Sequence, residues 1–136
     1  MGNMIKVGMA DLKICKAPDA LTTLGLGSCI GACLYDPVVK IAGMVHYMLP
    51  DSTKIKSNQN IAKFGDTGIR ELIRLMEEAG ARKSRIVAKI AGGARMFAVS
   101  TSVNLPGLNV GENNIEAARL NLSENGIAII AEDIGL

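Results

Sequence analysis

The sequence predicts one mixed α/β domain, with largely antiparallel sheets and two main helices. Short strand-like runs, punctuated by turn residues, fill most of the first half of the chain. Two stretches with helical spacing of apolar residues follow, at about 66–79 and 113–124. A length of 136 residues, without repeats or low-complexity linkers, suits a single domain covering residues 1–136.

The strands of the first half are expected at short apolar-rich runs. These runs cover residues 4–9, 11–15, 20–24, 30–35 and 40–49. Asp36-Pro37 lies between the last two runs and is a turn sequence, so these two runs are expected to form an antiparallel hairpin. Pro50 ends the second strand of the hairpin, because proline has no N–H for a ladder hydrogen bond. The polar residues 51–60 are expected to form an exposed loop.

The first helix is expected at residues 66–79, with Asp66 or Thr67 as its N-cap and Gly80 at the C′ position. Its inward positions follow the spacing i, i+3, i+4 and i+7: Ile69, Leu72, Ile73 and Met76.

A strand at 85–91, ending in Gly92-Gly93, and a loop-rich stretch at 97–110 are expected to follow. The glycine pair is expected to allow close backbone packing. The second helix, at about 113–124, ends at Gly126, and a final strand covers 127–131. Its inward residues are expected to be Ile115, Ala118 and Leu122.

Composition excludes several function classes. The chain is 49% hydrophobic but only 3% aromatic, which predicts an aliphatic core. Its net charge is +2 and its basic residues are scattered, which argues against a nucleic-acid surface. It has no secretory signal and no apolar run long enough to insert into a membrane. Three cysteines, Cys15, Cys29 and Cys33, cannot all pair within one chain, so the simplest location is a reducing cytoplasm.

One cysteine has the setting of a catalytic thiol. Cys29 ends the glycine-rich segment 25–29, and the only histidine, His46, follows 17 residues later. An imidazole can take the proton of a thiol, which is mostly protonated at neutral pH. Glycines allow a sharp turn that exposes the sulfur and nearby N–H groups, which could bind an oxyanion. Gly27, Ser28 and Cys29 form this turn, and the Cys29 N–H is the first candidate donor.

Structural interpretations of the same residues stay open at this point. Cysteine is often a small buried hydrophobe, and Cys15 and Cys33 are expected to be core residues. A lone histidine is often a hydrogen-bonded core residue. A zinc site formed by Cys29, Cys33 and His46 is disfavoured, since an extended segment would place the Cα atoms of the two cysteines about 13 Å apart, at roughly 3.3 Å per residue. No metal or cofactor is expected.

Four motifs resemble those of the chemotaxis protein CheD family, the chemoreceptor glutamine deamidases. They are TLGLGSC at 23–29, VHYMLPDS at 45–52, KIAGGARMF at 89–97 and AED at 131–133. The resemblance covers nearly the whole chain and implies a layered α/β sandwich. It also implies Cys29 as the nucleophile, His46 as the general base and Thr23 as the third member of the site.

The resemblance further implies an activity and partners. The expected enzyme is a protein-glutamine glutaminase that converts receptor glutamines to glutamates through a thioester. Some members also hydrolyse glutamate methyl esters, and many bind CheC, a phosphatase of the response regulator CheY. A non-catalytic adaptor that binds CheC and receptors is the alternative function, but an adaptor has no need of all three site residues.

Two departures from the family pattern stand out. Gly111-Glu112-Asn113-Asn114 lacks the arginine that the family usually has before the asparagine. The sequence ends at Gly135-Leu136, where family members usually continue into further strands, so a less stable domain is expected.

Overall fold

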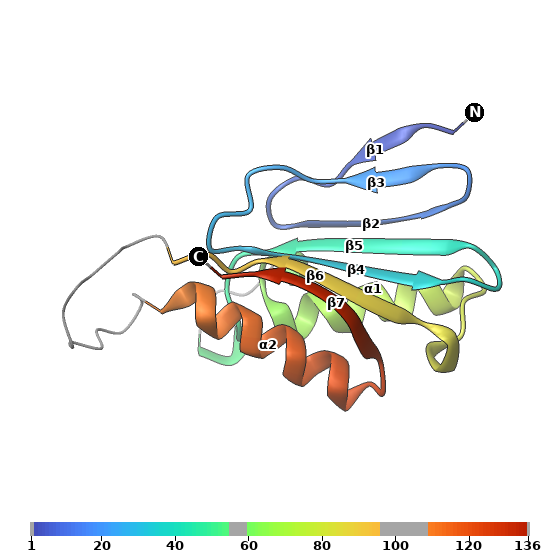
Figure 1. The fold of residues 1–136 in the computed structure, drawn as a ribbon. Coiled ribbons are helices and arrows are strands. Elements are labelled where there is room, and N and C mark those ends of the chain that lie inside the picture. Colours follow the sequence, from blue (N-terminus) through green and yellow to red (C-terminus); the bar gives the residue numbers. More distant parts are fainter. Residues whose placement is uncertain (1, 55–59, 96–108, 136) are drawn as a thin grey trace.

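A computed structural model describes residues 2–54, 60–95 and 109–135 of the chain (Figure 1). The strands are β1 (Met4–Lys6), β2 (Asp11–Lys16), β3 (Ala20–Thr22), β4 (Ile30–Asp36), β5 (Ile41–Tyr47), β6 (Val87–Gly92) and β7 (Ala128–Ile134). The helices are α1 (Gly65–Glu78) and α2 (Val110–Glu124), and the short 3-10 turns are η1 (Ser52–Lys54), η2 (Ile61–Lys63) and η3 (Lys83–Arg85).

The strands form two sheets. The larger has the order β2-β5-β4-β6-β7, with antiparallel neighbours except for the parallel pair β6 and β7. The smaller pairs β1 with β3 in parallel. Both helices lie on one side of the five-stranded sheet, and the small sheet lies on the opposite side (Figure 1). This arrangement confirms the prediction of an α/β fold with mixed, largely antiparallel sheets and two main helices.

The core lies between the five-stranded sheet and the two helices. Strand residues alternate between the two faces of a sheet, so every second residue of β4 and β5 points to the helices. Among these are Leu34, Val45 and Tyr47, all almost completely buried. The predicted inward residues of both helices belong to the same core: Ile69, Leu72, Ile73, Met76, Ile115, Ala118 and Leu122.

The predicted N-cap of α1 is wrong. Phe64 occupies the cap position without a side-chain hydrogen bond to the helix. Asp66 instead accepts hydrogen bonds from the backbone N–H and the hydroxyl of Ser52 (3.0 and 2.8 Å). The Thr67 hydroxyl donates to the Ile61 carbonyl (2.7 Å). Both side chains therefore bind the segment that precedes α1. This segment includes the short helix η1, where only a loop was expected.

Asp36 does more than begin a turn. Its carboxylate is completely buried and forms a salt bridge with Arg85 (2.9 Å). It also accepts the N–H groups of Val38 and Arg82 (both 2.9 Å). These donors hold the pKa of Asp36 well below its usual range, and the hydrogen bonds from Arg85 are the largest cause. The β4–β5 hairpin is thereby fixed to the segment before β6.

Candidate active site

The three predicted site residues come from three consecutive parts of the fold. Thr23 follows β3 directly, Cys29 precedes β4 directly, and His46 is the penultimate residue of β5. His46 is paired across the ladder with Gly31, and Ile30 with Tyr47. The backbone of Cys29 therefore lies at the end of β5 that carries His46.

His46 faces away from the main core. Its neighbours Val45 and Tyr47 point to the helices, so alternation directs the imidazole to the side of the small sheet. The ring is only 1% exposed, and its Nδ1 lies 2.9 Å from the hydroxyl oxygen of Thr23. Thr23, which the resemblance implies as the third member of the site, therefore contacts His46 directly.

The partners of the Thr23 hydroxyl determine where the proton of His46 lies. The hydroxyl has one proton and donates it to the Val7 carbonyl (2.7 Å). It can therefore only accept at its contact with His46, so Nδ1 carries the ring proton. The neutral ring then has its lone pair on Nε2, which is the nitrogen able to accept a proton.

The pKa of His46 is lowered by burial of the ring. Nε2 is buried, and none of the residues that the structure describes supplies it with a hydrogen bond. A neutral, unpartnered Nε2 is able to accept a proton at neutral pH. Nε2 therefore forms no hydrogen bond with the Cys29 thiol in this structure.

Burial also raises the pKa of the Cys29 thiol, which belongs to a residue only 7% exposed. Cys29 and His46 are therefore a neutral thiol and a neutral imidazole at pH 7, not a preformed thiolate–imidazolium pair. Such a site attacks a carbonyl only if the imidazole removes the thiol proton as the bond forms.

Comparison with known proteins decides the family. The profile described as CheD chemotactic sensory transduction matches residues 48–136. A probable chemoreceptor glutamine deamidase CheD of Lachnoclostridium phytofermentans is 61% identical over 136 residues, which are 100% of this chain and 83% of the relative. The chain belongs to the CheD family.

Other CheD relatives agree. The probable chemoreceptor glutamine deamidase CheD of Caldanaerobacter subterraneus is 52% identical over 132 residues, covering 97% of this chain and 80% of the relative. The chemoreceptor glutamine deamidase CheD of Halalkalibacterium halodurans is 44% identical over 136 residues, covering 99% of this chain and 83% of the relative.

The cysteine turn of this CheD chain is held by the end of β6. The Gly27 carbonyl accepts from the Ala94 N–H, and the Cys29 carbonyl accepts from the Gly93 N–H (both 2.8 Å). A Cβ at Gly92 would lie 2.1 Å from the Cys29 carbonyl oxygen. The expected close packing at the glycine pair is confirmed, and its partner is the cysteine turn itself.

Asn114 of α2 is a residue at the site that sequence reasoning missed. It is completely buried, and its amide donates to the carbonyls of Ser28 (2.8 Å) and Met48 (2.9 Å). Its position could have revealed it, because it lies three and four residues from the inward-facing Gly111 and Ala118. A polar residue on an apolar helix face needs a specific hydrogen-bonding partner.

The first candidate for an oxyanion donor is engaged within the turn. The Cys29 N–H already donates to the Leu26 carbonyl (2.8 Å), which closes the turn. The Ser28 N–H has no acceptor among the residues described by the structure. Of the three turn residues, Gly27 and Ser28 therefore have N–H groups without an acceptor in the described part of the chain.

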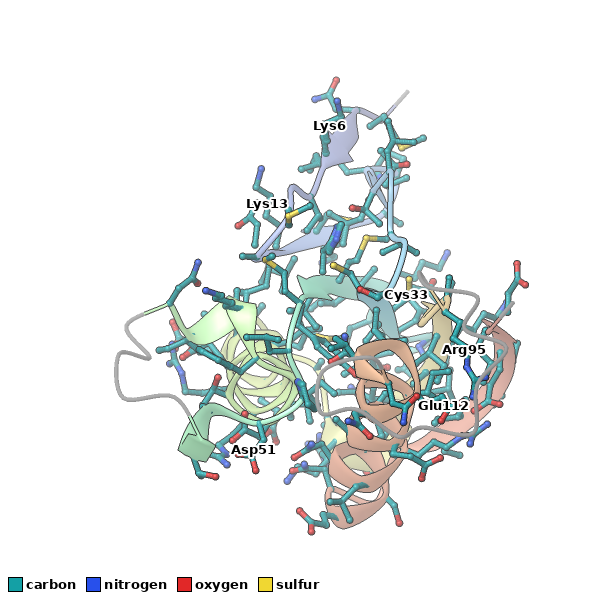
Figure 2. All side chains as sticks on the ribbon, turned by 90° about the vertical axis from the view of Figure 1, so that its left-hand side faces the viewer. Lys6, Lys13, Cys33, Asp51, Arg95 and Glu112 are labelled. Carbon is teal, nitrogen blue, oxygen red and sulfur yellow. The ribbon has the colours of Figure 1, made fainter. Side chains whose placement is uncertain are left out.

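The remaining cysteines differ from each other. Cys15 is buried as expected, whereas Cys33 is partly exposed on the outer face of β4 (Figure 2). Met44 is buried and Met48 partly buried, whereas Met96 lies outside the described residues.

Within ranges 2–54, 60–95 and 109–135, no three His, Cys, Asp or Glu side chains gather as a metal site would require. None of the described helices is long and apolar enough to span a membrane.

Proposed function

We propose that this chain deamidates glutamine side chains of chemoreceptors, with Cys29 as nucleophile, His46 as general base and Thr23 as the residue that orients His46. The observation that carries the proposal is the Thr23–His46 hydrogen bond, which leaves the lone pair of the imidazole on Nε2. The names of the relatives supply the substrate, since they are chemoreceptor glutamine deamidases.

In the proposed reaction, Nε2 of His46 removes the proton of the Cys29 thiol as the sulfur attacks the side-chain carbonyl of glutamine. The tetrahedral intermediate collapses when the imidazolium returns this proton to the departing nitrogen, so ammonia leaves and a thioester remains. His46 then takes a proton from water, hydroxide adds to the thioester, and glutamate and the thiol are released. The sum is one amide and one water converted to one carboxylic acid and one ammonia.

The negative oxygen of both intermediates needs a fixed donor. We assign the Ser28 N–H to this role, because the Cys29 N–H is occupied by the Leu26 carbonyl and Ser28 is the residue next to the nucleophile. A single donor of this kind typically contributes about 2.7–4 kcal/mol to lowering the barrier. Gly27, just before Ser28, has a φ of +53°, a conformation that glycine adopts easily.

The same acyl transfer would hydrolyse glutamate methyl esters, with methanol in place of ammonia as leaving group. We also infer a cytoplasmic location, because Cys15, Cys29 and Cys33 are free thiols and the cytoplasm keeps thiols reduced. A binding-only role with CheC, the alternative function, requires none of this chemistry.

The test is deamidation of a purified receptor cytoplasmic fragment, followed by ammonia release and by a mass gain of about one dalton per modified site. The wild-type chain and Cys33→Ala should both be active, whereas Cys29→Ala should be inactive with an unchanged circular dichroism spectrum. Cys33→Ala is a matched control, since it removes a thiol that the mechanism does not use. Activity of Cys29→Ala would refute the assigned nucleophile, and binding of CheC or receptor without any turnover by the wild type would favour the adaptor.

A further inference from the structure

Asn114 joins the two segments that carry the proposed nucleophile and base. Its two amide protons go to the carbonyls of Ser28, one residue before Cys29, and of Met48, two residues after His46. Building on the proposed function, we infer that Asn114 is a positioning residue that sets the separation of the Cys29 sulfur and Nε2 of His46.

The bond to Ser28 fixes the orientation of the cysteine turn. The carbonyl and the N–H of one peptide unit point in opposite directions. Because Asn114 holds the Ser28 carbonyl, the Cys29 N–H points away from α2, toward Leu26. The Ala94 N–H holds the Gly27 carbonyl in the same manner, which turns the Ser28 N–H away from Ala94. Asn114 and Ala94 together therefore orient the two peptide units before the sulfur.

Asn114 is itself held from several sides. Tyr47 is next to His46 on β5, and its hydroxyl donates to the backbone carbonyl of Asn114. Gly111, one turn earlier, packs so closely that a Cβ there would lie 2.4 Å from the Ala94 carbonyl oxygen. Arg95 and Glu112 lie side by side and form an ion pair at the same end of α2 (Figure 2). The side-chain amide of Asn114 is therefore held in place, and it cannot shift together with the cysteine turn if that turn moves.

The unpartnered oxygen of the side chain argues against a purely structural role. Oδ1 of Asn114 is buried and has no hydrogen-bond partner in the described part of the chain. Burying such an oxygen reduces stability, so this part of the side chain does not favour asparagine at position 114. The two N–H groups are therefore the part of the side chain with a use, and both act on backbone next to the reacting residues.

Loss of both donors should affect the chemical step more than substrate binding. Asn114→Leu keeps the branching and the number of side-chain heavy atoms, and it leaves the Ser28 and Met48 carbonyls without their donor. A misplacement of about 1 Å between reacting groups can cost on the order of 100-fold in rate. We expect kcat to fall by roughly 10- to 100-fold, with KM changed by less than about twofold.

A second readout does not depend on turnover. His46 is the only histidine, so proton NMR of the untagged protein gives one titration curve without assignment. Burial lowers the pKa of His46, and a loosened link at Met48 should admit water to the ring. The pKa of His46 in Asn114→Leu should therefore move upward, toward that of a solvated histidine.

The matched control is Asn121→Leu, on the same helix. Among the residues that the structure describes, the amide of Asn121 donates only to the Ala117 carbonyl of its own helix (2.8 Å). This variant should keep the kcat, KM and His46 titration of the wild type. If Asn114→Leu does not fold, Asn114→Ser, which cannot overfill the site and can reach one carbonyl at most, is measured against the same expectations.

The outcomes separate this inference from the proposed function. An unchanged kcat and an unchanged His46 titration in the folded Asn114 variant would overturn the positioning role, even if Cys29→Ala is inactive. Equal changes in the Asn114 and Asn121 variants would also overturn it. If the wild type does not deamidate receptors, the proposed function fails, whereas a titration shift specific to Asn114 would still support its link to His46.

Discussion

Replacing Thr23 by valine tests the proposed orientation of the imidazole. Valine has nearly the shape of threonine but neither donates to Val7 nor accepts from Nδ1 of His46. The buried Nδ1–H then has no acceptor, and the tautomer with its proton on Nε2 becomes competitive. That tautomer cannot remove the proton of the Cys29 thiol, because its Nε2 has no free lone pair.

The size of the effect follows from the hydrogen bond that is lost. Leaving a buried donor unpaired costs about 1–3 kcal/mol. At 1.36 kcal/mol for each tenfold change, an unpaired Nδ1–H on the imidazolium of the transition state lowers kcat/KM by about 5- to 150-fold. Removing the base itself costs typically 10²–10⁴-fold, so Thr23→Val should be less damaging than His46→Ala.

The assay compares initial rates of ammonia release for the wild type, Thr23→Val and Thr23→Ser. Serine keeps the hydroxyl, so Thr23→Ser should retain most of the activity. A Thr23→Val rate within about twofold of the wild type, below the smallest loss expected from an unpaired buried donor, would refute the tautomer argument. Equal losses in the serine and valine variants would show that the methyl packing of Thr23, not its hydroxyl, is what counts.

Three further predictions use other parts of the structure. Because burial lowers the pKa of His46, kcat/KM should fall with decreasing pH only at a midpoint below 6.5, and His46→Ala should lose this acidic limb with nearly all turnover; a midpoint above 6.5 contradicts the burial argument. Gly92→Ala places a Cβ against the Cys29 carbonyl at a φ of +103°, so it should lower kcat by a larger fraction than it lowers the urea midpoint. Normal kinetics of this variant would show that the cysteine turn tolerates displacement. Because the pKa of Asp36 is depressed, its carboxylate stabilises the fold at pH values above the usual carboxyl pKa, and this stability is lost as the pH falls below that value. Asp36→Asn should therefore lower the urea midpoint at pH 7, and the urea midpoint of this variant should decrease less below about pH 4. An Asn variant as stable as the wild type at pH 7 would mean that the charge of the pair with Arg85 is dispensable.

The arrangement of elements was largely predictable because local patterns agree with the fold. The inward residues of α1 and α2 follow helical spacing, and Gly80 and Gly126 follow the helix ends with positive φ, as expected. The hairpin at Asp36-Pro37 is also confirmed. The predicted strand at 4–9 is shorter, since pairing of β1 ends at Lys6 and a turn follows at residues 9 and 10.

The errors occur where a polar side chain has a distant partner. Asp66 was expected to cap α1, but it accepts two hydrogen bonds from Ser52, which lies 14 residues earlier in the sequence. The Cys29 N–H was the first candidate oxyanion donor, but in this structure it donates to the Leu26 carbonyl and closes the turn. Asn114 was not recognised because its partners, Ser28 and Met48, are 86 and 66 residues away in the sequence. Spacing along a chain contains no information about such pairs.

The acceptor of the Thr23 hydroxyl makes the amino-terminal arm part of the site. That acceptor is the carbonyl of Val7, directly after Lys6, the last residue of β1 that pairs with β3. β1 has only three residues, and every one of its ladder partners belongs to β3. Fusing a bulky tag to the first residues, or cleaving them with a protease, would free the hydroxyl to rotate while the helix-packed core stays intact. Preparations of this protein that differ only in their amino-terminal processing should therefore differ in specific activity before they differ in melting temperature.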